Sequence, residues 1–98
     1  MDIEIGDKSD CHVDVQEALD PLVGKLFRST RYPMMSTGDR LMRDEIVQFV
    51  HYGSWKFAQD RDPHETVFWA TFITGGRVAS RGYGSLRMFS LEFVRIQV

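Results

Sequence analysis

The feature that most constrains the fold is a nearly unbroken run of β-branched and aromatic residues at positions 66–74, Thr-Val-Phe-Trp-Ala-Thr-Phe-Ile-Thr. Such residues favour strands, and a run that is apolar in both phases of the alternation indicates a strand buried on both faces. Gly75-Gly76 follows directly and predicts a turn. We therefore expect residues 66–74 to form a central strand.

The N-terminal segments 2–6 and 11–16 alternate between apolar and polar residues on either side of a Gly/Asp/Ser turn. This pattern predicts a hairpin with one acidic face. The alternative is a single strand at 2–6 followed by a helix from about residue 10, because residues 16–19 are good helical material.

Two helices are predicted in the first half of the chain. Asp20-Pro21 is typical of a helix start, since Asp caps and Pro fits the first position, and apolar residues follow at helical spacing up to Phe27. After a connector at 29–35, Ser36 and Asp39 form a capping pair that opens a second helix. This helix carries an apolar stripe between residues 41 and 50 and ends at Gly53.

The second half is predicted to be mainly strand. We expect a strand at 54–58, a turn at 60–63, and a glycine-interrupted loop or irregular strand at 77–85. Residues 86–98 are expected to form a long final strand. Its apolar phase slips twice, which indicates bulges or burial on both faces.

These elements define the expected fold class. It is α+β, with a single, mostly antiparallel sheet of four or five strands and two helices packed on one face. Ninety-eight residues form one domain, 1–98, and 43% hydrophobic residues supply a core without disulfides or metals. No cofactor is predicted.

The sequence also indicates a compartment. Its single cysteine, Cys11, excludes an intramolecular disulfide and fits a reducing environment. The acidic N-terminus does not resemble a signal peptide, and no apolar run approaches the length of a membrane span. We therefore expect a cytoplasmic location.

Charge is distributed unevenly along the chain. Residues 1–20 carry seven acids against one base, a local charge of −6, whereas residues 21–98 carry seven acids against eleven bases, a charge of +4. This asymmetry either steers binding to a charged partner or is neutralised within the fold.

The predicted acidic face is the first candidate site, with Asp2, Glu4 and Asp14 as candidates for docking on a basic protein partner. Carboxylates beside His12 also raise the alternative of a divalent metal site, although no recognised ligand spacing is present.

The second candidate is a basic loop in which Arg77, Arg81 and Arg87 surround Tyr83. Guanidinium groups beside a tyrosine suit phosphate contacts and base stacking. The run at 81–84, Arg-Gly-Tyr-Gly, resembles the opening of the RNP1 motif of RNA-recognition-motif domains. The resemblance ends there, because Ser85 and Met88 occupy the aromatic positions that follow, so the chain is not assigned to that family. The alternative interpretation is a solvated hairpin turn.

Aromatic and methionine residues give the third candidate. Tyr32, Met34 and Met35 lie on the predicted connector, and such residues are enriched at protein interfaces. No catalytic motif occurs. The sequence therefore favours a non-enzymatic interaction protein, an adaptor or inhibitor that docks on a protein partner. A nucleic-acid-contacting module is the alternative, and a homodimer is a further interpretation.

Overall fold

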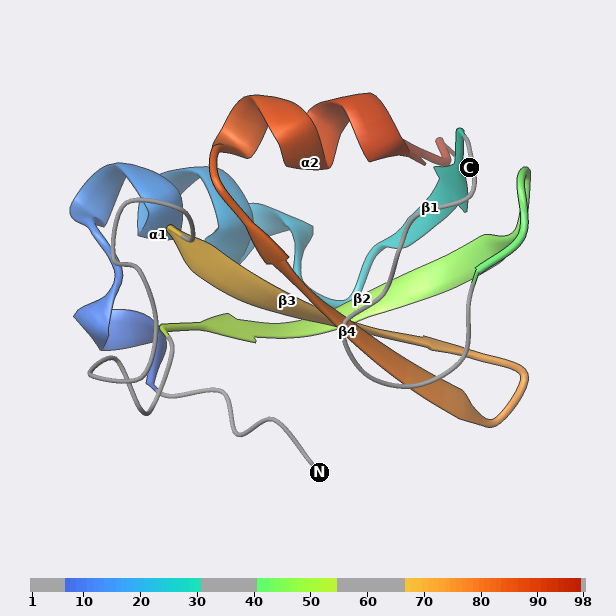
Figure 1. The fold of residues 1–98 in the computed structure, drawn as a ribbon, viewed down its shortest axis with the longest axis horizontal. Coiled ribbons are helices and arrows are strands. Elements are labelled where there is room, and N and C mark those ends of the chain that lie inside the picture. Colours follow the sequence, from blue (N-terminus) through green and yellow to red (C-terminus); the bar gives the residue numbers. More distant parts are fainter. Residues whose placement is uncertain (1–6, 31–40, 55–66, 98) are drawn as a thin grey trace.

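The structure is a computed structural model that describes residues 7–30, 41–54 and 67–97, and the structural statements below refer to this part of the chain. It contains one five-stranded antiparallel sheet with two α-helices against one face (Figure 1). The expected α+β fold class is confirmed. In chain order the elements are η1 (Lys8–Asp10), α1 (Val13–Leu19), η2 (Asp20–Leu22), β1 (Leu26–Ser29), β2 (Ile46–Gly53), β3 (Phe68–Thr74), β4 (Arg77–Tyr83), α2 (Leu86–Glu92) and β5 (Phe93–Arg95), where η marks a 3-10 helix.

The strand order is β4-β3-β2-β1-β5, so β4 and β5 are the two edges of the sheet. The apolar run predicted to be a central strand is β3, an interior strand that pairs with β2 and β4. Gly75 and Gly76, with φ of 54° and 81°, form the predicted turn between β3 and β4. Two consecutive positive φ angles match a two-residue hairpin turn of type I′.

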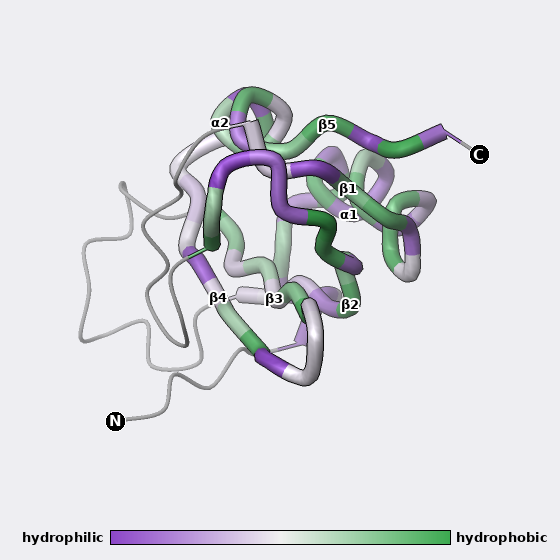
Figure 2. The backbone as a smooth tube through the Cα atoms, turned by 90° about the vertical axis from the view of Figure 1, so that its right-hand side faces the viewer, coloured by the Kyte–Doolittle hydropathy of each residue, from purple (hydrophilic) through white to green (hydrophobic). Residues whose placement is uncertain are grey.

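Helix α2 carries the chain from β4 at one edge to β5 at the other and lies over the sheet between them (Figure 1). The ring of Phe89 contacts an aromatic ring from every strand, at centroid distances between 5.3 and 6.1 Å. These partners are Phe27, Phe49, Phe68, Phe72, Tyr83 and Phe93. Figure 2 shows the corresponding hydrophobic stretches in the strands and in α2.

Residues 13–19 form α1, so the hairpin predicted for 11–16 is wrong and the helical alternative is correct. Cys11, Val15 and Leu19 are buried in the core at a spacing of four residues, which is a helical face. The imidazole Nδ1 of His12 accepts a hydrogen bond from the backbone N–H of Asp14 and caps the helix. Segment 2–6 lies outside the described residues.

The helix predicted to start at Asp20-Pro21 is also wrong, because α1 ends there and only the short η2 follows. The chain leaves helical geometry at Val23, which is extended; Gly24 then adopts a φ of 88°, and β1 begins two residues later.

The second predicted helix is wrong over its described part, since residues 46–53 form β2. Phe49 pairs with Phe72 and His51 pairs with Thr71, so Val50 is an extra residue that forms a β-bulge. The exposed Ile46, the buried Phe49 and the extra Val50 together place apolar residues at 46, 49 and 50, which imitates helical spacing. His51 is consequently an exposed strand residue.

The long final strand predicted at 86–98 is the fourth correction. Ser85 caps α2 by accepting a hydrogen bond from the N–H of Met88, and only β5 is a strand in this segment. The spacing between Leu86, Phe89 and Phe93 is three and then four residues, which is the period of a helix. When the segment is interpreted as a strand, this period appears as slips in the two-residue alternation. The uncertain segment at 77–85 contains β4, which pairs with β3 without interruption. Residues 55–58 and the turn at 60–63 lie outside the described part.

We predict that Phe89→Ala lowers the free energy of unfolding by about 3–5 kcal/mol, because it removes the ring around which the core aromatics pack. Urea denaturation followed by circular dichroism measures this change. Leu91→Ala on the same helix is the matched control, since Leu91 is exposed and its loss costs within about 0.5 kcal/mol. Equal effects of the two substitutions would contradict the assignment of Phe89 to the core.

Candidate protein-docking surface

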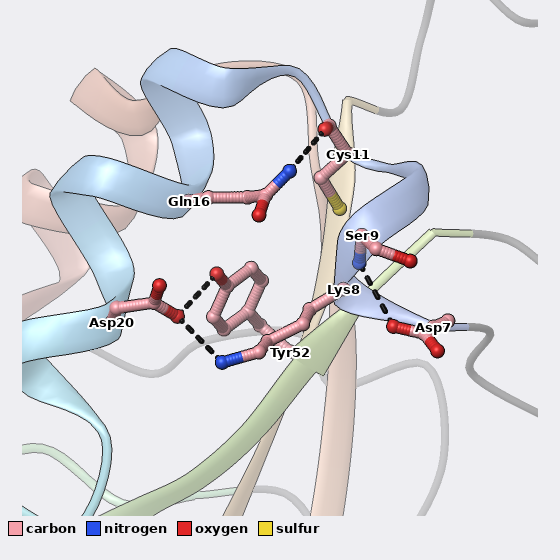
Figure 3. A network of polar contacts seen from close by, with 7 residues as sticks. All are labelled: Asp7, Lys8, Ser9, Cys11, Gln16, Asp20 and Tyr52. Carbon is pink, nitrogen blue, oxygen red and sulfur yellow. Dashed lines mark hydrogen bonds and ion pairs between the residues drawn. The ribbon is translucent and has the colours of Figure 1, made fainter.

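The acidic N-terminal segment is attached to the sheet through Tyr52 of β2 (Figure 3). The Tyr52 hydroxyl donates a hydrogen bond of 2.6 Å to Oδ1 of Asp20, at the end of α1, and the Lys8 ammonium lies 3.1 Å from the same oxygen. Tyr52 is buried, so this carboxylate joins the two ends of the segment to a fixed point in the core.

Further hydrogen bonds hold the segment's own conformation (Figure 3). Oδ1 of Asp7 accepts from the N–H of Ser9, and the Gln16 side-chain amide donates to the carbonyl of Cys11. The Cys11 side chain is buried, and burial together with the nearby Asp10 and Asp7 raises the pKa of its thiol. A thiol in these surroundings stays protonated at neutral pH and is a poor nucleophile.

The anchoring contacts also favour the ionised form of Asp20. The hydrogen bond from Tyr52, followed by that from Lys8, lowers the pKa of the Asp20 carboxyl. Burial, followed by the hydrogen bond to Asp20, raises the pKa of the Tyr52 hydroxyl. The pair therefore consists of a neutral phenol donating to a charged carboxylate, a strong type of hydrogen bond.

The outer side of the same segment presents three further carboxylates, Asp10, Asp14 and Glu17, all exposed. We call these three residues the acidic face. Residues 7–20 hold five acids against one lysine, a charge of −4. Within the described part of the chain, the ion pair of this segment joins two of its own members, Lys8 and Asp20.

The basic body forms its own ion pairs. Arg28 contacts Asp44 at 2.7 Å, Arg81 contacts Glu92 at 2.9 Å, and Arg77 contacts Glu45. In the described ranges, therefore, the acidic segment and the basic body do not neutralise each other, and the charge asymmetry in the sequence is also an asymmetry of the surface.

Of the predicted protein-docking residues, Asp14 lies on the acidic face, with 77% of its side chain exposed. Asp2 and Glu4 lie outside the described residues, as do Tyr32, Met34 and Met35. Among residues 7–30, 41–54 and 67–97, no group of three or more His, Cys, Asp or Glu side chains is arranged to hold a metal ion.

The four residues predicted to contact nucleic acid are placed differently from the expected loop. Tyr83 is buried and stacks on Phe68 at 5.3 Å, and its hydroxyl donates to Glu92 at 3.1 Å. The guanidinium of Arg81 lies 5.4 Å from the Tyr83 ring centre and pairs with the same Glu92. The ring and hydroxyl of Tyr83 and the guanidinium of Arg81 are therefore engaged inside the molecule.

The two remaining residues of the predicted loop lie apart from this cluster. Arg77 pairs with Glu45, which hydrogen-bonds the N–H of Met42 in the turn before β2. Arg87 is exposed on α2. The structure does not bring the four residues together on one exposed surface.

Sequence reasoning missed Glu92, the carboxylate that organises Arg81 and Tyr83. It is 2% exposed at the end of α2. The available signal was a single acid in the largely apolar segment from Leu86 to Val94, since an acid buried among apolar residues requires a partner.

Comparison with protein-family models, with curated proteins and with solved structures finds no match to this chain. In the described residues no helix is long and apolar enough to cross a membrane.

We predict that acidification weakens the anchor at Asp20. Because the folded-state pKa of Asp20 is lowered, its contribution to stability is present above the unfolded-state pKa of about 4 and is lost as pH falls through the folded-state value. The difference in unfolding free energy between the wild type and Asp20→Asn should be constant above about pH 5 and shrink below about pH 4. Urea denaturation across this range measures it, and a difference that does not change with pH would contradict the charged hydrogen bond.

We also predict that the cluster around Tyr83 acts on stability. Tyr83→Phe removes one buried hydrogen bond and should cost about 1 kcal/mol. Glu92→Ala removes the carboxylate that faces Arg81 and should cost about 3–5 kcal/mol. Arg87→Ala is the exposed control, with an expected effect within about 0.5 kcal/mol. Denaturation curves that are the same for all three variants would contradict the buried cluster.

Proposed function

We propose that the protein is a small non-enzymatic interaction protein, a cytoplasmic adaptor or inhibitor, that docks on a basic surface of a protein partner through its acidic face. Asp2 and Glu4 precede this segment in the sequence and add two further negative charges to it.

One observation carries this proposal. Asp10, Asp14 and Glu17 are exposed, and within the described residues no lysine or arginine pairs with them. The segment that holds them is fixed to the core by the bond between Tyr52 and Asp20. A rigid, uncompensated charge cluster raises the rate of encounter with an oppositely charged partner without an ordering cost on binding.

The same charge disfavours nucleic acid as the partner, because carboxylates repel phosphates. Arg81 and Tyr83, the centre of the predicted nucleic-acid site, contact Glu92 within the molecule. We therefore propose a protein, in preference to nucleic acid, as the partner.

The test begins with capture of partners from a native extract on immobilised protein, with and without nuclease. A captured protein that persists after nuclease treatment is then used purified, and its association rate is measured by stopped flow at low and high salt. Neutralising the acidic face with Asp10→Asn, Asp14→Asn and Glu17→Gln together should lower the association rate by about tenfold at low salt and change the dissociation rate little.

Asp44→Asn is the matched control, because it removes an exposed carboxylate of the basic body and Asn tolerates the φ of 62° at this position. The proposal fails if the triple variant associates as fast as the wild type, if Asp44→Asn has an equal effect, or if nuclease abolishes capture.

A further inference from the structure

The face of the sheet opposite the helices carries a row of aliphatic side chains. Leu26, Gln48, Ile73 and Val78 are directly paired across β1, β2, β3 and β4, so their side chains lie side by side on one face. Ile46 and Val94 add a neighbouring row through their pairing with Arg28. Each of the five aliphatic residues is between 37% and 56% exposed.

This aliphatic face is hollowed. A shallow, open groove of about 520 Å³ lies on it, lined by Leu26, Ile46, Gln48, Ile73 and Val78 and by the Gly75-Gly76 turn. Exposed apolar clusters of this kind on a small protein are typical of binding sites.

The dimensions of the face select the kind of occupant. Five strands span four intervals of about 4.8 Å, or about 19 Å, whereas the two aliphatic rows are only about 7 Å apart along the strands. A long and narrow patch falls well below the roughly 800 Å² per partner of a stable interface, so a second copy stacked face to face would rest largely on polar surface. A helix about 10 Å wide and about 12–13 residues long matches both dimensions.

On the opposite face of the same sheet, a helix already lies across the strands. Helix α2 lies there between the two edge strands (Figure 1). It packs Phe89 against rings from every strand. The aliphatic face offers a second helix comparable apolar contacts on the side that α1 and α2 leave uncovered.

The charges around the aliphatic face indicate which side chains a bound helix would carry on its flanks. Arg28 lies between Ile46 and Val94 and is 45% exposed while paired with Asp44. Arg43 and Arg95, next in sequence to this region, are exposed and have no ion pair with another described residue. A surface with an excess of arginine favours acidic flanking side chains.

We propose that the aliphatic face binds an amphipathic helix of a partner protein, aliphatic along one side and acidic on its flanks. The inference concerns a different surface from the acidic face and does not depend on the function proposed above. Recognition would follow the helix-in-groove mode, with anchors spaced three, four and seven residues apart.

The experiment uses the full chain labelled with ¹⁵N and a synthetic peptide of about 14 residues, with leucines at the anchor spacing and glutamates on both flanks. Amide shifts on addition of peptide should map to β1, β2, β3 and β4 around the groove. Val78→Ser and Ile73→Ser should each weaken binding by about tenfold. Leu91→Ser, which removes an equally exposed aliphatic side chain from α2, should leave the affinity unchanged.

A second peptide with lysine in place of glutamate tests the charge, and it should bind at least about tenfold more weakly. The proposal is overturned if no shift occurs up to about 1 mM peptide, if the shifts map to α1 or α2, or if the lysine peptide binds equally well. It is also overturned if sedimentation shows a dimer that Val78→Ser dissociates, because a second copy then occupies the face. The mapping on the wild-type chain decides the site even if a variant fails to fold.

Discussion

The structure depends on the packing of one ring, Phe89, against the inner face of the sheet. A helix that connects two opposite edges has to be held in the middle of its span, and Phe89 provides this contact because aromatic rings from all five strands converge on it. Edge-on arrangements, as with Phe27 and Tyr83, and stacked ones, as with Phe72, both occur. Interlocked rings of this kind fix the position of a helix as well as burying its surface.

Polar contacts then fix α2 at its two ends. Ser85 caps its first turn, and Glu92 at its last residue accepts from Tyr83 and pairs with Arg81. The carbonyl of Glu92 also accepts the N–H of Thr30, next to β1. One residue thus joins α2 to both sides of the sheet, and the arginine and tyrosine that suggested a nucleic-acid site form part of the internal framework.

The sequence was most informative where local pattern and tertiary position agree. The run that became β3 is apolar in both phases, and the two glycines after it require the positive φ angles that they adopt. The helices were misplaced for two physical reasons. Strand β2 carries apolar residues on both faces and an extra residue at Val50, and together these resemble the spacing of a helix. The aromatic residues of α2, which pack against a sheet, resemble those of a strand. The charge pattern singled out Asp14, which the structure places on the exposed side of α1. It gave no sign of the bond between Tyr52 and Asp20, because that bond joins residues thirty-two positions apart.

The placement of β5 at the far edge has a consequence for folding order. Phe27 of β1 pairs with Arg95 of β5, so two strands that are far apart in the sequence lie side by side in the sheet. Closing a loop of that length is entropically costly, and pairings distant in sequence slow folding. The hairpin of β3 and β4 is local and is able to form early, whereas β1 keeps one open edge until β5 pairs with it. A growing chain therefore exposes this edge of β1 until β5 has been synthesised.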